Sequence, residues 1–166
     1  PGLYALDAGM SIALVGLFFS VQEGAHVLGR PAAGRMADRR GYRPTICMGM
    51  AGIALALPLL AMVQAPVALL ALAMLLGVGQ ALVFPTTTAL VAVQIDTQHV
   101  GAGMGLLGAM QNAGKVIGPV VAGLLLTRMS YEAMFGLLGF LLMLGALLVG
   151  VAGRRITYVR VEAGKS

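Results

Sequence analysis

Five long apolar stretches constrain this chain more than any other feature of its sequence. They cover residues 11–30, 45–63, 67–93, 100–126 and 133–151. Each is close to or longer than the roughly 20 residues that a helix needs to cross about 30 Å of hydrocarbon. Strands of a membrane barrel would be about half as long and would alternate apolar with polar side chains. The sequence therefore predicts an all-α membrane protein with five transmembrane helices.

The composition supports a membrane location. Of the 166 residues, 59% are hydrophobic and 10% are charged, whereas soluble domains carry roughly 25% charged residues. In a bilayer, unlike in water, so many apolar side chains can point outward. The formal net charge of +5 comes from basic residues beside the apolar stretches, which favours membrane orientation over nucleic-acid binding.

Basic residues gather at two places that predict the same side of the membrane. One group surrounds the first break and the other lies in the C-terminal tail (Arg30, Arg35, Arg39, Arg40, Arg43; Arg154, Arg155, Arg160, Lys165). With five spans, the first break and the tail must share a side. Lys and Arg concentrate in cytoplasmic loops, so we expect the 34–44 loop and the tail to be cytoplasmic.

The sequence offers no sign of a metal, cofactor or enzyme site. Cys47 is the only cysteine, so a disulfide within the chain is impossible, and no Cys and His spacing fits a metal. A nucleophile–base constellation and a phosphate-cradling loop are also missing. The chain begins with Pro1 and has no signal-peptide pattern, and we expect it to be a fragment of a longer protein.

The first and fourth stretches resemble each other. An offset of 89 residues, without gaps, brings these identical residues together: Gly16 and Gly105, Leu17 and Leu106, Gln22 and Gln111, Val27 and Val116, Gly29 and Gly118, Ala33 and Ala122, Gly34 and Gly123. Because the two copies are three spans apart, they must run in opposite directions. Inverted three-helix repeats of this kind are a known transporter construction.

Polar residues are unevenly shared among the predicted spans. They lie in the first, third and fourth spans, while the second and fifth have almost none (Gln22, Glu23, His26; Gln80 and residues 85–88; Gln111, Asn112, Lys115). Polar groups in hydrocarbon are costly and turn toward protein or a wet cavity. We therefore expect the first, third and fourth spans to be interior, with the second and fifth mostly facing lipid.

Lys115 is the most informative single residue because it lies near the middle of the fourth span. An unpaired ammonium there costs about 2.5–3.5 kcal/mol on insertion scales, so it needs an acidic partner, a polar cavity or a substrate. We hypothesise that Glu23 and Lys115 form a polar seam that binds substrate or carries a proton. A structural ion pair that locks two helices is the alternative.

Four other polar residues are candidates for a substrate or proton pathway. His26 shares a helical face with Glu23 and is a candidate proton carrier, although a structural histidine is the alternative. Asn112 shares a face with Lys115 in the fourth span. Gln80 and Gln111 are candidate hydrogen-bond partners of a substrate, or of neighbouring helices.

The first break reads GRMADRRGYR from Gly34 to Arg43. It resembles the signature loop of the major facilitator superfamily, although Tyr42 replaces the first member of the closing basic pair. Gly34 lets another helix come close, Asp38 can cap a helix or pair with an arginine, and the glycine at 41 permits a tight turn. The resemblance implies a gating loop that uses Gly34, Asp38, Arg39, Gly41 and Arg43. The alternative is an ordinary basic loop.

The fourth span contains GKVIGPVVAG over residues 114–123. This resembles the glycine–proline motif of the superfamily's antiporter branch, with an alanine where a glycine is usual. The small residues recur every fourth position, which suits close helix packing, and the proline is expected to kink the span. The predicted packing motif is Gly114, Gly118, Pro119, Ala122 and Gly123. Ordinary tight packing is the alternative.

The resemblance extends from about residue 9 to residue 151. It implies that residues 1–153 supply five helices of a six-helix half, followed by a polar tail at 154–166. It also implies secondary transport by alternating access, with proton-coupled efflux of an unidentified small molecule across a bacterial inner membrane. The other half would be a partner. We favour helices eight to twelve of a twelve-helix transporter; the alternatives are helices two to six, or a non-transporting fragment or assembly partner.

Overall fold

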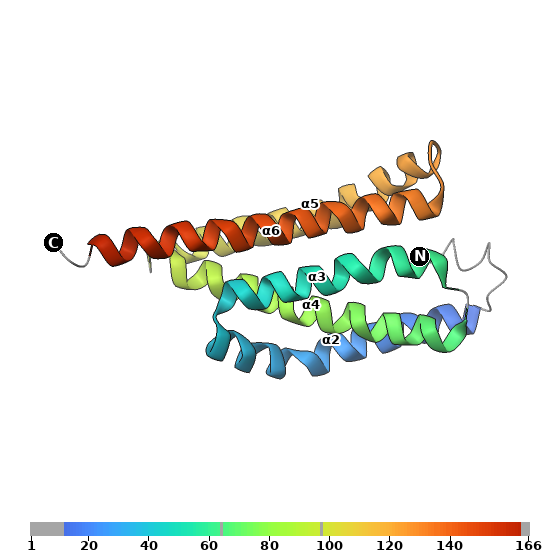
Figure 1. Ribbon diagram of the computed structural model, residues 1–166, viewed down its shortest axis with the longest axis horizontal. Helices are drawn as coiled ribbons and strands as arrows, with labels where there is room; N and C mark the ends of the chain where they lie inside the picture. The colour runs from blue at the N-terminus through green and yellow to red at the C-terminus, as the bar shows by residue number, and fades with distance from the viewer. Residues whose placement is uncertain (1–11, 64, 97, 164–166) are drawn as a thin grey trace.

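The computed structural model describes residues 12–63, 65–96 and 98–163, and its side chains as far as Val151. The described chain is helical (Figure 1). The helices are α2 (Ile12–Arg40), α3 (Tyr42–Met62), α4 (Pro66–Gln94), α5 (Val100–Leu126) and α6 (Tyr131–Ala163). All five are long and apolar enough to cross a membrane, which confirms the all-α, five-span prediction.

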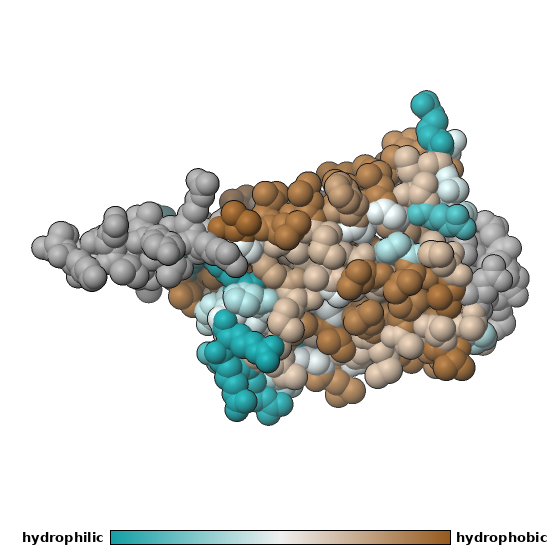
Figure 2. Space-filling view, viewed as in Figure 1, coloured by the Kyte–Doolittle hydropathy of each residue, from teal (hydrophilic) through white to brown (hydrophobic). Residues whose placement is uncertain are grey.

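Consecutive helices run antiparallel, and α2 and α5 also run in opposite directions (Figure 1). The opposite directions of α2 and α5 are those expected of inverted repeats. The ends of α2 and α4 and the starts of α3 and α5 lie together at one end of the bundle. Apolar side chains cover the middle of the molecule, while hydrophilic ones gather toward its ends (Figure 2).

The first helix is longer than the sequence predicts. It continues to Arg40, so Gly34, Asp38 and Arg39 of the expected loop lie in its last turns. Pro31 lies inside the helix without ending it. The extension has a local cause, because the segment is rich in Ala and Arg and its last turn carries two arginines at the negative end of the helix dipole. The predicted loop is therefore mostly helix.

The break between α2 and α3 is a single glycine. Gly41 has φ 92° and ψ 157°, a backbone conformation that a residue with a Cβ avoids. Its N–H donates to Ala37 O at 2.8 Å, and its carbonyl accepts from Thr45 Oγ1 at 2.9 Å. The turn is thus held at both sides by the helices that it joins.

This turn gives a direct stability prediction. Gly41→Ala should lower the free energy of unfolding by about 1–2 kcal/mol, because alanine is strained at positive φ. Gly34→Ala is the matched control from the same motif, since no atom lies within 4 Å of a Cβ built there. Thermal unfolding in detergent, followed by circular dichroism, measures both variants. Equal losses in the two variants would contradict the backbone explanation.

Helix α4 is the centre of the packing. It packs against α2 and α3, and α3 also packs against α6, whereas α5 touches its neighbours only sparsely. Small residues permit the close contacts: a Cβ on Gly49 of α3 would lie 2.8 Å from Gly79 O of α4, and a Cβ on Gly139 of α6 would lie 2.7 Å from Ala54 O. Dry helix contacts in membranes favour such residues. The core therefore lies around α3 and α4.

The expected division into interior and lipid-facing spans is correct for α4, which is packed on two sides, and for α2 and α5, which turn polar residues toward a cavity, but it is wrong for α3. Helix α3 lies between α4 and α6 and buries several side chains (Thr45, Ile46, Ala54, Ala56, Leu60, Ala61). Helix α5 buries none of its residues. The physical reason is that polar residues seek water and line open spaces, whereas small apolar residues make the dry contacts. The distribution of polar residues therefore predicts which helices line the cavity, and not which helices form the core.

At the C-terminus, α6 continues to Ala163. The polar tail was expected to begin at residue 154, so most of it extends the last helix. Residues 164–166 of the predicted tail lie outside the described residues, as do residues 1–11, 64 and 97 of the predicted half-domain, which include Ser11 at the start of the first predicted span.

Candidate functional site

A cavity of about 740 Å³ lies between α2, α4 and α5. Its polar and charged lining comes from all three helices (Glu23, His26, Arg30; Gln80, Thr88; Gln111, Lys115). Phe84, Pro85, Ala89 and Ala92 of α4 supply the apolar part. The three helices that line the cavity are those in which the sequence concentrates polar residues.

The cavity brings together five of the six residues that the sequence singles out for a substrate or proton pathway. These are Glu23, His26, Gln80, Gln111 and Lys115. Asn112 is exposed and does not line the cavity. Their roles remain predictions, but their meeting in one cavity shows that the polar positions of separate spans share one space.

Glu23 and His26 form a pair along α2. The carboxylate Oε2 lies 3.4 Å from His26 Nδ1. The histidine side chain is only 12% exposed, while that of Glu23 is 64% exposed. Nε2 of His26 is buried and has no hydrogen-bond partner. A buried, unsatisfied ring nitrogen is unusual in a folded protein, so this atom marks His26 as a candidate functional residue.

A close helix contact fixes the position of this pair. A Cβ on Gly77 of α4 would overlap Gln22 O and lie 3.0 Å from the His26 backbone nitrogen. Only a residue without a side chain lets α2 lie this close to α4. The sequence signal for this contact was the glycine-rich run that precedes Gln80. The contact places His26 against α4, with its ring 6.1 Å from that of Phe84.

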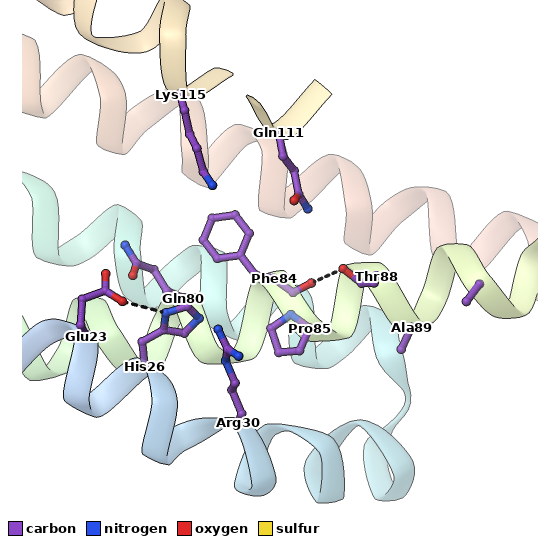
Figure 3. A pocket seen from close by; sticks show the side chains of 11 residues that line it. Glu23, His26, Arg30, Gln80, Phe84, Pro85, Thr88, Ala89, Gln111 and Lys115 are labelled. Atoms are coloured by element: carbon purple, nitrogen blue, oxygen red, sulfur yellow. Dashed lines mark hydrogen bonds and ion pairs between the residues drawn. The ribbon is translucent and has the colours of Figure 1, made fainter. Parts of the chain in front are cut away.

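Lys115 reaches into the cavity from α5, on the opposite side from α2 (Figure 3). The direct ion pair that the sequence suggested between Glu23 and Lys115 is not formed: within the described side chains, Glu23 pairs with His26. In Figure 3 the ring of Phe84 lies between Lys115 and the Glu23–His26 pair. That a bound molecule joins Glu23 and Lys115 into one polar seam stays a prediction.

Depth along the helices explains why the two sides meet. At about 1.5 Å per helical residue, His26 lies about 21 Å from the Arg40 end of α2 and Lys115 about 22 Å from the Val100 end of α5. Both ends lie at the same end of the bundle. The repeat that aligns His26 with Lys115 therefore corresponds to a similar depth in the fold.

Six of the lining residues are not among the predicted site residues. They are Arg30, Phe84, Pro85, Thr88, Ala89 and Ala92. Arg30 belongs to the basic group around the first break, but it also lies seven positions after Glu23 and shares its helical face. Thr88 donates its hydroxyl to Phe84 O at 3.0 Å, a bond within α4 that satisfies the hydroxyl and turns it along the helix.

The motif residues of the 34–43 segment lie apart from this cavity. Asp38 and Arg39 are exposed at the end of α2 and Arg43 is half-buried. Within the part of the chain that the structure describes, Asp38 has no arginine partner, and no helix approaches Gly34. A gating role for these residues stays a prediction.

The glycine–proline segment of α5 is also unpacked. No described atom lies within 4 Å of a Cβ built on Gly114, Gly118 or Gly123. Ala122 alone packs against the core, in a half-buried position, and Pro119 lies inside the helix. Within the described chain, no other helix packs tightly against these glycines. Their packing against another part of the transporter stays a prediction.

Comparison with known proteins assigns the family. The sequence profile of the Major Facilitator Superfamily matches residues 1–162. The multi-drug resistance efflux pump PmrA of Streptococcus pneumoniae is 33% identical over 135 residues, covering 80% of this chain and 33% of PmrA. The multidrug resistance protein MdtG of Serratia proteamaculans is 30% identical over 120 residues, covering 72% of this chain and 29% of MdtG. The uncharacterized MFS-type transporter YuxJ of Bacillus subtilis is 29% identical over 119 residues, covering 72% of this chain and 30% of YuxJ.

The chain thus spans about a third of the length of these relatives. The family profile nevertheless covers almost all of the chain itself, and the five membrane-spanning helices agree with it. The chain is an integral membrane protein, and it belongs to the Major Facilitator Superfamily.

Proposed function

We propose that this chain supplies part of the solute pathway of a proton-coupled exporter that works by alternating access. The observation that carries the proposal is the cavity between α2, α4 and α5, where charged and amide side chains from three spans meet deep in the predicted membrane. Charged groups at such depth are expensive and mark substrate or ion pathways. The efflux direction comes from the similarity to PmrA and MdtG, which are named for multidrug resistance.

The exposed sides of α2 and α5 support a second half as partner. Helix α5 buries none of its own residues, and apolar side chains along it are widely exposed, such as Met110 and Val116. The cavity is bounded by only three helices. In the complete transporter, meaning this chain together with its remaining helices, the other half would close the cavity and rock against it.

Proton coupling would use Glu23 and His26. The two side chains pair along α2 at 3.4 Å, and the buried Nε2 of His26 lacks a partner. Glu23 is the exposed member and His26 the less exposed one, so a proton could pass from water to the interior through the pair. The basic end of α2 would face the cytoplasm of a bacterial inner membrane.

Efflux from cells tests this function. A bacterial strain without its major exporters would express the complete transporter, this chain alone, or neither. We expect the complete transporter to lower the accumulation of some members of a fluorescent dye panel, and a protonophore to abolish the effect. We expect the chain alone to match the empty vector. If the complete transporter never changes accumulation although it is present in the membrane, the proposal fails.

A non-transporting assembly partner is the second candidate function. The uncovered helix α5 favours it, because a surface of this kind can serve association alone. The same experiment separates the candidates: only a pathway-forming chain loses efflux when cavity residues change while assembly, measured by co-purification of the other half, is preserved.

A further inference from the structure

We propose that the cavity accepts an organic anion, whose acidic group is held between Arg30 and Lys115 and whose apolar part lies against Phe84. The proposal rests on the proposed function and adds the chemical class of the solute. It follows from the balance and placement of charge in the cavity lining, which favours anions over cations and neutral molecules.

Two cations and one acid line the cavity. The acid, Glu23, lies at ion-pair distance from His26. Within the described side chains, neither Arg30 nor Lys115 has an acidic partner. The free charge that the lining presents to a solute is therefore positive, and protonation of His26 would only increase it.

The two cations come from opposite walls. Arg30 rises from α2 and Lys115 descends from α5, and both side chains point into the space beside α4 (Figure 3). A carboxylate, sulfonate or phosphate can accept charge-assisted hydrogen bonds from both sides at once. Binding of this kind would join α2 to α5, which touch each other little in the chain itself.

The rest of the lining suits an organic molecule more than a small inorganic ion. Phe84 is 42% exposed and its ring lies between the two walls in Figure 3. An aromatic or aliphatic body can pack on this ring, while Gln80 and Gln111 offer amide groups at the edges. A volume of about 740 Å³ is in the range of drug-sized binding sites, roughly 300–1,000 Å³.

A cationic solute would fit this lining poorly. It would meet Arg30 and Lys115, and its one acidic partner would be a carboxylate already engaged with His26. A neutral solute would leave both cations without a counter-charge and would gain no charge-assisted contact from either of them. The anion is the one class that turns both uncompensated charges into favourable contacts.

Three probes with one ring system test the charge preference. They are 1-naphthoate, 1-naphthamide and 1-naphthylmethylammonium, titrated by calorimetry into the complete transporter in detergent. We expect naphthoate to bind about tenfold or more tightly than either of the others. Arg30→Gln and Lys115→Gln should each weaken naphthoate about tenfold or more, whereas Lys115→Arg, which keeps the charge, should retain most of the affinity.

Arg128→Gln is the matched control, since this exposed cation lies between α5 and α6, away from the cavity, and should leave all three affinities unchanged. If the transporter prefers the ammonium or the amide, and Phe84→Ala weakens that binding, the proposed preference for anions is wrong but the cavity still binds a solute. If all three probes bind and no cavity variant changes their affinity, both the anion preference and the proposed solute pathway are wrong.

Discussion

Lys115→Ala should reduce efflux by the complete transporter about tenfold or more, with normal expression in the membrane. The ammonium reaches the cavity from α5 without an acidic partner in the described chain. Its removal therefore deletes a contact with the solute and leaves no acidic side chain without its partner. A structural ion pair would behave differently, because breaking it strands the partner charge and destabilises the fold.

Glu23→Gln should also impair efflux, since it removes the acid of the Glu23–His26 pair while it keeps the size of the side chain. Two matched controls carry the same charge changes outside the cavity: Arg128→Ala for the cation and Glu132→Gln for the acid, both exposed beyond α5. Dye efflux per amount of membrane protein is the readout. If Lys115→Ala and Glu23→Gln both transport normally, the cavity is not the pathway.

Gly77→Ala should have the largest effect on stability, with a loss of about 1–3 kcal/mol in the free energy of unfolding. The added methyl would overlap the backbone oxygen of Gln22 and meet the Cβ of Ala25 at 2.8 Å. Backbone cannot turn aside as a long side chain does, so α2 must move away from α4. The shift would carry the Glu23–His26 pair with it.

Two glycines serve as comparisons for this variant. Gly24→Ala on α2 meets nothing within 4 Å and should leave stability unchanged or higher. Gly49→Ala is also tight, with Gly79 O at 2.8 Å, but lies between α3 and α4, away from the cavity. We expect both Gly77→Ala and Gly49→Ala to lower the thermal midpoint, and only Gly77→Ala to weaken solute binding in the molecules that remain folded. Equal binding in the two variants would contradict the positioning role of Gly77.

The membrane fold was largely predictable from the sequence, because span length and hydropathy are local properties. The end of the first helix was not, since Pro31 and the basic segment suggested a break where the chain continues to Arg40. The decisive residue is Gly41, whose positive φ is a backbone property that residue type permits but does not impose.

The sequence was sufficient to predict which polar residues line the site, but not how their side chains are arranged. The cost of Lys115 and Glu23 in hydrocarbon pointed to a shared cavity, and the structure places both in its lining. The pairing of Glu23 with His26, and the position of Phe84 between the walls, depend on side-chain directions that periodicity does not give. Arg30 was missed because a basic residue near a span end reads first as an orientation signal.

The most direct test of the central claim is whether water reaches the cavity within the membrane. In a cysteine-free background that includes Cys47→Ser, Gln111→Cys on the cavity wall and Leu147→Cys on an exposed apolar face of α6 place single thiols at similar depth, about 15 and 16 residues from the same end of the bundle. A membrane-impermeant maleimide reacts with a thiolate, which forms only in contact with water. In the complete transporter in intact vesicles we predict that Gln111→Cys is labelled and Leu147→Cys is not. Protection of Gln111→Cys to the same degree as Leu147→Cys, from both sides of the membrane, would contradict a solute pathway through this cavity.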